Sequence, residues 1–455
     1  MKIIILGAGQ VGSSVLNSLA SEANDIVMVD KNPALLRDLQ DRYDIATVQG
    51  SASHPTVLAR AGAEDAQMLI AVTSDDETNM LACQIADTLF KIPKKIARVR
   101  AIEYLSYPAL FAQDALPIDV VISPEQIITH FIERLLEYPG ASQVLDFADG
   151  KVRLVSVRAR PDGQLVGREL RELHQHMPNV HARITAIFRD GATIIPNGKV
   201  VIEAGDEVFF VASSEEIKDV MSELRKVDKP YKRLMFAGGG HIGKRVALTL
   251  ESRYQVKVIE RDVARAKKIA ADLSRTVVLQ GDASDKELLL SENIENTDIF
   301  CAITNNDEAN ILSSMLAKRL GARRVICLVN KMAYAELIDT NMVDLVLSPQ
   351  QSTIGSLLRY IRQADVVQVH SLRHGSAEAL EAVAHGKRGE SEIVGQRIDQ
   401  IKLPAGVVMG ALVRGEEVIQ VHHDTVIEHG DHVIMFLHDK KLIKAVEKMF
   451  QPPEA

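Results

Sequence analysis

The stretch Gly7-Ala8-Gly9-Gln10-Val11-Gly12 decides the fold, because it joins the short apolar run Ile3–Leu6 to a helical pattern. Its counterpart lies 231 residues further along the chain, follows the apolar run Leu234–Ala237, and reads Gly238-Gly239-Gly240-His241-Ile242-Gly243. A strand, a glycine turn and a helix are the first parts of a dinucleotide-binding unit. The chain therefore contains this opening twice.

An acidic residue ends the second predicted strand of each copy. Asp30 lies 18 residues beyond Gly12, and Glu260 lies 17 residues beyond Gly243. Such a carboxylate can accept hydrogen bonds from an adenosine ribose and would repel a 2′-phosphate, which favours NAD or an adenine nucleotide over NADP. The glycines would admit a pyrophosphate to the positive end of each helix. The alternative is that they only make a tight turn.

The repeat continues beyond these openings. Three polar segments of the first copy match three of the second, and the matched pairs are 48–53 with 279–284, 71–79 with 302–310, and 121–126 with 346–351. They lie where strands three, four and six of a doubly wound sheet should end, which is the edge where such sheets bind ligands. We therefore expect the repeated polar residues to cluster on one rim.

A smaller β-rich unit follows each predicted nucleotide domain. In the first, we expect a helix over 166–170, a hairpin with its turn at 189–191 and a closing strand over 207–211, and similar segments recur at 394–398, 413–416 and 430–434. The predicted fold is α/β, with two Rossmann-like doubly wound parallel sheets, each followed by a small α+β domain. The expected domains are 1–123, 143–227, 232–348 and 368–453.

Composition limits the classes of function. A net charge of −8 over 455 residues argues against a nucleic-acid partner, because affinity for nucleic acid depends on basic residues that neutralise phosphates. No stretch approaches 18 uncharged apolar residues, and the first strand begins at once, so we expect neither a membrane span nor a signal peptide and predict a cytoplasmic protein. The broad apolar face of the predicted helix at 127–136 suggests self-association.

Two further clusters have competing interpretations. A metal site is conceivable at His422, His423, His429 and His432, but without carboxylate or cysteine ligands these side chains are more often solvent-facing, and we predict no metal. The acids 75–77 suggest a cation site, although acids at a helix start usually interact with the helix dipole. Arg98 and Arg100 alternate along a strand, so only one of them can face a ligand, and Arg98 is the favoured one.

At this point the chain resembles the regulators of potassium conductance, the RCK or KTN family, in their duplicated form. The resemblance rests on both glycine turns, Asp30 and Glu260, segment 73–77, segment 281–283, and the turns at 205–206 and 430–431. It implies a cytoplasmic regulatory subunit, peripheral on the inner membrane, that forms a homo-oligomeric ring, expected to be a tetramer. It also implies binding of NAD or NADH and of ATP or ADP, and a Trk-type membrane potassium transporter subunit of the TrkH or TrkG kind as partner.

The resemblance also assigns site residues. In the first copy it places five residues at the pyrophosphate, one at the ribose, two at the rim of strand four and one cation near phosphate or nicotinamide: Gly7, Ala8, Gly9, Gln10 and Val11; Asp30; Thr73 and Ser74; Arg98. In the second copy it gives Gly238, Gly239, Gly240, His241, Ile242, Glu260, Asp282 and Thr304. Two departures stand out, since Ser51 replaces the family's aspartate and the second copy has Cys327-Leu328-Val329 in place of Arg98-Val99-Arg100. The two sites therefore need not bind the same nucleotide.

Three classes of function remain. A ligand-sensing regulator is expected to couple nucleotide binding to a change of ring shape. An NAD-dependent oxidoreductase is the alternative, but the sequence offers no acid–base residue set and no substrate domain, so no catalytic residue is assigned. A scaffold with vestigial sites is disfavoured by the intact Asp30 and Glu260.

Overall fold

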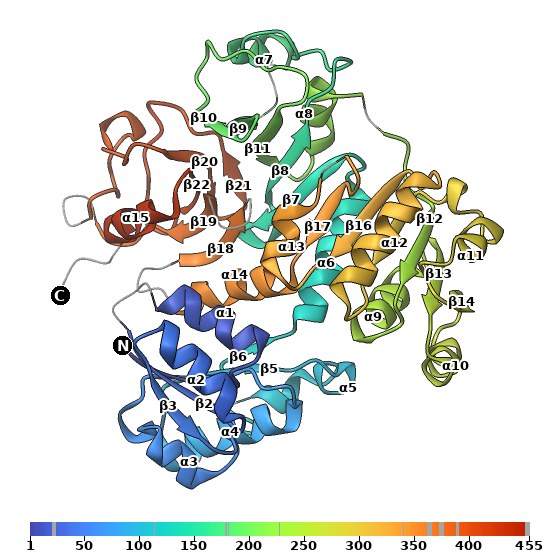
Figure 1. Cartoon of the computed structure of the whole chain (residues 1–455). Coiled ribbons are helices and arrows are strands. Elements are labelled where there is room, and N and C mark those ends of the chain that lie inside the picture. Colours follow the sequence, from blue (N-terminus) through green and yellow to red (C-terminus); the bar gives the residue numbers. More distant parts are fainter. Residues whose placement is uncertain are drawn as a thin grey trace. The chain divides into compact units, whose positions relative to one another are not determined.

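The computed structural model describes residues 1–20, 24–112, 114–177, 180, 182–226, 228–339, 341–361, 366–372, 377–387 and 391–450. The domain limits expected at 227 and 453 lie outside these residues. The chain divides into two compact units, Met1–Ile128 with Ser348–Leu357, and Thr129–Leu347 with Leu358–Ala455. Figure 1 shows the succession of helices and strands along the chain.

The first six strands form one parallel sheet in the order β3-β2-β1-β4-β5-β6. The strands are β1 (Lys2–Leu6), β2 (Asp25–Asp30), β3 (Ala46–Gln49), β4 (Met68–Ala71), β5 (Lys94–Arg98) and β6 (Val120–Ile122). The helices are α1 (Gln10–Leu19), α2 (Pro33–Arg42), α3 (Pro55–Arg60), α4 (Asp76–Phe90), α5 (Ile102–Leu105) and α6 (Pro124–Glu137). Ile3, Ile4, Ile5 and Leu6 are fully buried, as expected for a central strand with both faces covered.

The second copy repeats this order as β14-β13-β12-β15-β16-β17, which confirms two doubly wound sheets. Its strands are β12 (Arg233–Ala237), β13 (Gln255–Glu260), β14 (Val277–Gln280), β15 (Ile299–Ala302), β16 (Arg324–Leu328) and β17 (Leu345–Leu347). Its helices are α9 (His241–Leu250), α10 (Val263–Asp272), α11 (Lys286–Ser291), α12 (Asp307–Arg319), α13 (Met332–Leu337) and α14 (Pro349–Ile361).

Strand register corrects one expected match between the copies. Ala71 of β4 pairs with Ala97, and Ala302 of β15 pairs with Cys327, so Arg98 corresponds to Leu328. The expected match of Arg98 with Cys327 was therefore wrong by one residue. Pairing with the neighbouring strand fixes the phase of each fifth strand.

Two five-stranded antiparallel sheets make up the smaller units, in the orders β10-β9-β11-β8-β7 and β18-β19-β22-β20-β21. The first contains β7 (Ala141–Phe147), β8 (Val152–Arg158), β9 (Ala182–Arg189), β10 (Ala192–Ile194) and β11 (Glu207–Ser213), with helices α7 (Leu173–His176) and α8 (Ile217–Leu224). The second contains β18 (Val366–Leu372), β19 (Ala377–Val383), β20 (Val407–Arg414), β21 (Glu417–Ile419) and β22 (His432–Leu437), with α15 (Ile443–Phe450). Both expected hairpins and both closing strands are confirmed.

One apolar core joins these two antiparallel sheets. Phe147, Phe188 and Phe209 of the first sheet share a buried cluster with Leu372 and Phe436 of the second. A polar contact crosses the same region, because the buried carboxylate of Glu381 accepts a hydrogen bond from the Ala148 amide at 2.8 Å. The two smaller units therefore pack on each other within the chain.

The helix expected over 166–170 was wrong. Val166 forms a bridge with Ile202, and Gly167 adopts a positive φ of 85°, which a continuing right-handed helix does not allow. A short 3-10 turn begins only at Leu170. The corresponding Gly395 of the second copy also has a positive φ, of 77°. Glycine at this place makes a turn rather than a helix.

The Gly-Asp turn before each closing strand holds a buried ion pair that the sequence did not reveal. Asp206 is 1% exposed and accepts hydrogen bonds from Nε and Nη2 of Arg189, both at 2.8 Å. Asp431 accepts the same bonds from Arg414 at 2.8 and 2.9 Å. A bidentate arginine–carboxylate pair thus ties each hairpin to its closing strand.

Part of the apolar face of α6 is buried. Ile128, Ile132 and Leu135 are fully buried. Ile127 and Phe131 of the same face are only half-buried, so the self-association expected from this helix stays a prediction. Across the residues that the structure describes, no helix combines the length and apolar character needed to cross a bilayer.

Candidate functional site

The first and third glycines of each turn are required by the fold. Gly7 and Gly238 have φ values of +103° and +110°, which side-chain-bearing residues rarely adopt. A Cβ atom added to Gly12 would lie 1.8 Å from the carbonyl oxygen of Gly7, and one added to Gly243 would lie 1.9 Å from that of Gly238. These glycines therefore form the turn and let the helix approach its strand.

The second glycine is different. Gly9 and Gly240 precede α1 and α9 with ordinary φ values of −71° and −68°, and a Cβ added to either would meet no atom within 4 Å. Neither helix start carries a side-chain cap or an acidic residue in its first turn. The folded chain thus leaves open space beside an uncompensated helix N-terminus, the arrangement that accepts a phosphate.

The acid of the second strand lies directly beside this turn. Asp30 accepts hydrogen bonds from the amides of Ala8 and Asn32, both at 2.7 Å. Glu260 accepts the equivalent bonds from Gly239 at 2.9 Å and Asp262 at 2.8 Å. Because a carboxylate has about four acceptor positions, each acid keeps capacity for a ribose hydroxyl. The structure thus brings the turn and the acid together in both copies.

The rim of strand four also meets the glycine turn. A Cβ on Gly7 would lie 2.9 Å from the Thr73 Cα, and one on Gly238 would lie 3.0 Å from Thr304 Cγ2. The Thr73 hydroxyl donates to Oδ1 of Asn79 at 2.7 Å, and the Thr304 hydroxyl donates to Asn310 at 2.6 Å. Both threonine side chains therefore already have protein partners.

Asn79 and Asn310 are residues whose role the sequence did not reveal, although both lie in the repeated segments. Each is fully buried, and each donates from its amide nitrogen at 2.9 Å to a carbonyl at the end of the fifth strand, that of Arg98 or Leu328. They therefore fix the loop after strand four to the end of strand five.

The acids after strand four have structural partners. Asp75 caps α4 through the Thr78 amide, and Asp76 accepts hydrogen bonds from the amides of Arg100 and Ala101 at 2.7 and 2.9 Å. The equivalent Asp307 binds the Lys331 amide at 2.8 Å. These bonds support the helix-start interpretation over a cation site.

Arg98 already has an acidic partner in the folded chain. Its guanidinium lies 3.8 Å from the buried carboxylate of Glu125, at the start of α6. Burial lowers the pKa of Arg98, and the charge of Glu125 opposes that shift. Arg100 ion-pairs with Asp76 at 3.2 Å and also donates to the carbonyl of Ser74, whose side chain is exposed. The second copy has Leu328 and Gln350 in place of Arg98 and Glu125.

The remaining predicted residues surround the turns. Gln10 and His241 are exposed at the first helical position, and Val11 and Ile242 are half-buried beside them. Asp282 is exposed, and hydrogen bonds from the hydroxyl and amide of Ser284 hold the pKa of its carboxyl below the ordinary value. Ser51 occupies the same position in the first copy, as expected, and its hydroxyl lies 3.4 Å from that of Ser53.

The histidines expected at strand ends do not converge. His432 hydrogen-bonds Glu381, His422 lies 3.0 Å from Gln420, and the His429 ring stacks edge-on against His385. Within the described part of the chain, no three histidine, cysteine or acidic side chains gather as a metal-binding group.

Two family models match this chain. The TrkA-N domain matches residues 3–124 and 234–349, and the TrkA-C domain matches 154–225 and 389–450. The potassium uptake protein TrkA of the Trk system from Vibrio alginolyticus is 54% identical over 453 residues, which cover 99% of each chain. The protein of the same name from Halomonas elongata is 55% identical over 451 residues, again 99% of each chain.

Solved structures support the same fold. The crystal structure of the GsuK RCK domain superposes with a TM-score of 0.62 at 17% identity and covers 99% of this chain and 94% of that one. The structure described as the GsuK channel bound to NAD has the same score and identity, with coverage of 99% and 78%. Full-length identity above one half is decisive for the family. The chain therefore belongs to the family of the Trk system potassium uptake protein TrkA.

Proposed function

We propose that this chain is the nucleotide-sensing regulatory subunit of a Trk-type potassium uptake system. It binds NAD or NADH, and ATP or ADP, at the two glycine turns. The observation that carries the proposal is the unfilled space at Gly9 and Gly240, where no part of the described fold requires glycine. A pyrophosphate against the first-turn amides of α1 and α9 accounts for the absence of a side chain there.

The sites favour sensing over chemistry. Asp30 and Thr73 already hydrogen-bond neighbouring protein groups, as do Glu260 and Thr304. The names of the relatives are those of uptake proteins rather than enzymes.

Regulation then follows from differential binding. A nucleotide shifts an equilibrium between two shapes only as far as its affinities for those shapes differ. A bound nucleotide would bridge the first and second strands of each copy. It would contact the amides before α1 or α9 and the carboxylate of Asp30 or Glu260. Binding of the nucleotide in either copy would move the N-terminus of α1 or α9 relative to Thr73 or Thr304.

The partner in this proposal is a membrane potassium transporter subunit of the TrkH or TrkG kind. The regulator acts as a homo-oligomeric ring, a tetramer, on the cytoplasmic face of the inner membrane. In this proposal the two larger domains sense nucleotides, and the two smaller ones hold the assembly together. The larger domains are 1–123 and 232–348, and the smaller ones are 143–227 and 368–453.

The test compares alanine at the open glycines with alanine at a matched position. Gly9→Ala and Gly240→Ala should each weaken NADH binding at one site about tenfold or more in calorimetry, because the methyl group occupies the pyrophosphate position. Each should cost no more than about 1 kcal/mol of unfolding free energy. Gly198→Ala, which adds a methyl 3.5 Å from Arg171 Cβ, is the control and should change neither quantity.

Full NADH affinity in both variants would refute the proposed sites. Steady oxidation of NADH by the purified chain would instead support the oxidoreductase alternative.

A further inference from the structure

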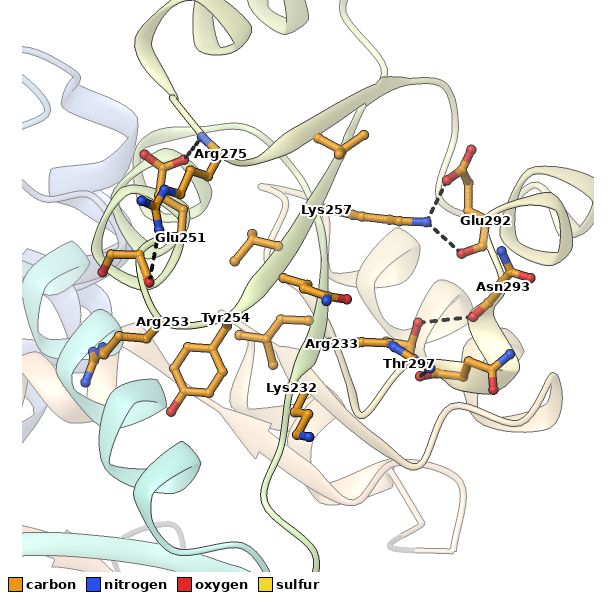
Figure 2. Close-up of a pocket in the computed structure, with 16 residues that line it drawn as sticks. Lys232, Arg233, Glu251, Arg253, Tyr254, Lys257, Arg275, Glu292, Asn293 and Thr297 are labelled. Carbon is orange, nitrogen blue, oxygen red and sulfur yellow. Dashed lines mark hydrogen bonds and ion pairs between the residues drawn. The ribbon is translucent and has the colours of Figure 1, made fainter.

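A pocket of about 900 Å³ lies on the second nucleotide domain, at the edge of the sheet opposite to its glycine turn. The amino ends of β12 and β13 and the loops before β13, β14 and β15 line it (Figure 2). Strand β12 runs from this pocket to the turn at Gly238, and its five residues span roughly 15 Å. The volume of the pocket lies in the range of small-molecule sites.

The lining is strongly basic although the whole chain is acidic. Five cations and two carboxylates contribute to it, which gives a formal charge of +3, and these residues are Lys232, Arg233, Arg253, Lys257, Arg275, Glu251 and Glu292. The chain as a whole carries −8. A concave cationic surface with partly apolar walls raises the local concentration of anions.

Both carboxylates are already engaged. Glu251 accepts hydrogen bonds from the amides of Ser274, Arg275 and Thr276 at 2.9–3.1 Å. Burial alone would raise the pKa of Glu251, but these bonds hold it below the ordinary value. Glu292 receives the ammonium of Lys257 at 2.8 Å, as Figure 2 shows.

Three of the five cationic side chains have no carboxylate partner in the part of the chain that the structure describes, although the backbone amides of Lys232 and Arg233 both donate to Asp298. Arg253 pairs with Glu133 of α6 at 2.6 Å, and Lys257 pairs with Glu292. Lys232, Arg233 and Arg275 make no ion pair with any residue that the structure describes. One guanidinium nitrogen of Arg233 and one of Arg275 donate to backbone carbonyls at 3.3 and 3.5 Å, and the other guanidinium donors stay available.

The first copy keeps a cation at one of these positions and lacks it at others. Strand pairing matches Arg233 with Lys2, and Lys257 with Val27. Arg275, two residues before β14, matches Asp44, two residues before β3. Lys2 lies 4.0 Å from Asp65, so its charge is locally opposed. The basic character of this edge is therefore particular to the second copy.

We propose that this pocket binds a ligand with a chain of phosphates, contacted by Lys232, Arg233 and Arg275. Guanidinium groups match phosphate oxygens in pairs, and a lysine ammonium adds a point charge. The half-buried ring of Tyr254 and the exposed side chain of Val277 offer an apolar wall for a nucleoside attached to that chain. The site is independent of the proposed function, because it uses neither glycine turn.

The experiment uses calorimetry on the full chain with inorganic tripolyphosphate as probe. Arg275→Gln and Lys232→Gln should each weaken binding about tenfold or more. Lys267→Gln, which removes one exposed charge on α10 outside the pocket, is the matched control and should leave the affinity unchanged. The affinity of the unaltered chain should fall as salt is added.

Several results would overturn the proposal. They are no binding of tripolyphosphate, an equal loss in Lys267→Gln, and a loss in Gly240→Ala without one in Arg275→Gln. Binding of ATP and of tripolyphosphate to the Gly9→Ala, Gly240→Ala double variant distinguishes the two sources of phosphate. Tighter binding of ATP than of tripolyphosphate there supports a nucleotide, and equal binding supports a free polyphosphate. Capture by vesicles with anionic headgroups, without tripolyphosphate binding, would refute the proposal.

Discussion

The first and second nucleotide domains share a backbone and differ in the charges placed around it. Both contain an open second glycine, an acid bonded to the turn, and a threonine–asparagine pair at the rim. Beyond these, the first has the pair Arg98–Glu125 where the second has Leu328, and the second has a basic pocket at its far edge. Features required by the turn are thus repeated, while charges not needed for folding differ.

The largest expected effect tests the shared part. Gly12→Ala and Gly243→Ala should each cost about 4 kcal/mol or more of unfolding free energy, because the new methyl would overlap a backbone oxygen that cannot move without breaking the turn. Urea unfolding, or soluble yield if folding fails, measures this. A difference of more than about 1 kcal/mol between the two variants would show that the turns are not equivalent.

The next effect tests the main difference. Arg98→Leu gives the first copy the residue of the second and removes the cation from the buried Glu125 carboxylate, so it should cost about 2–3 kcal/mol. Adding Glu125→Gln, as in the second copy, should recover most of that loss. A double-mutant cycle by urea unfolding measures the coupling. Purely additive costs would show that the pair does not act as a unit.

A smaller effect concerns acid. Burial alone would raise the pKa of Asp146, but hydrogen bonds from His130 and Arg153 and the charge of Arg134 hold it well below 3.8. A lowered folded-state pKa stabilises the protein above the unfolded value, and this contribution is lost as the pH falls through and below about 4. Asp146→Asn should therefore lower stability near neutrality by about 1–2 kcal/mol and flatten the decline in acid.

The second copy is the control for that prediction. At the same register it pairs Ser371 with Glu378, where the first copy pairs Asp146 with Arg153. Ser371→Ala should leave the acid limb of the stability curve unchanged in urea unfolding between pH 3 and 7. An unchanged limb in Asp146→Asn would contradict the assignment to Asp146.

The smallest effect concerns the one side-chain difference inside the turn. Ala8 of the first copy corresponds to Gly239, where a Cβ would lie 2.4 Å from the flexible end of Ile269. Because that methyl can move aside, Gly239→Ala should cost less than about 1.5 kcal/mol in thermal unfolding. Ala8→Gly is the reciprocal variant and should cost less than about 1 kcal/mol. A larger loss in Gly239→Ala would show that Ile269 is locked.

Local patterns made much of the fold predictable. The glycine turns, the buried strands and the hairpin at Asp190-Gly191 each depend on residues close together in the sequence, and the structure confirms them. The turn at Gly167 was mistaken for a helix, because the residues around it are compatible with either state until φ is known.

The partners from distant segments could not be read from the sequence. Asp206 was predicted only as a turn residue, yet its carboxylate binds Arg189 across the sheet. Arg98 was predicted as a ligand cation, and no sequence pattern indicated that Glu125 lies opposite it. Such pairings depend on how strands and helices come together, and a single sequence does not record this.

The shared core of the two antiparallel sheets has a consequence for how the copies diverge. Phe209 and Phe436 meet within one polypeptide, so their association does not depend on protein concentration. In a symmetric homodimer every substitution appears on both sides of the interface. Here one chain contains both partners as separate segments, so each can differ in its charges from the other. Linkage of the two halves thus permits a division of labour that symmetry would forbid.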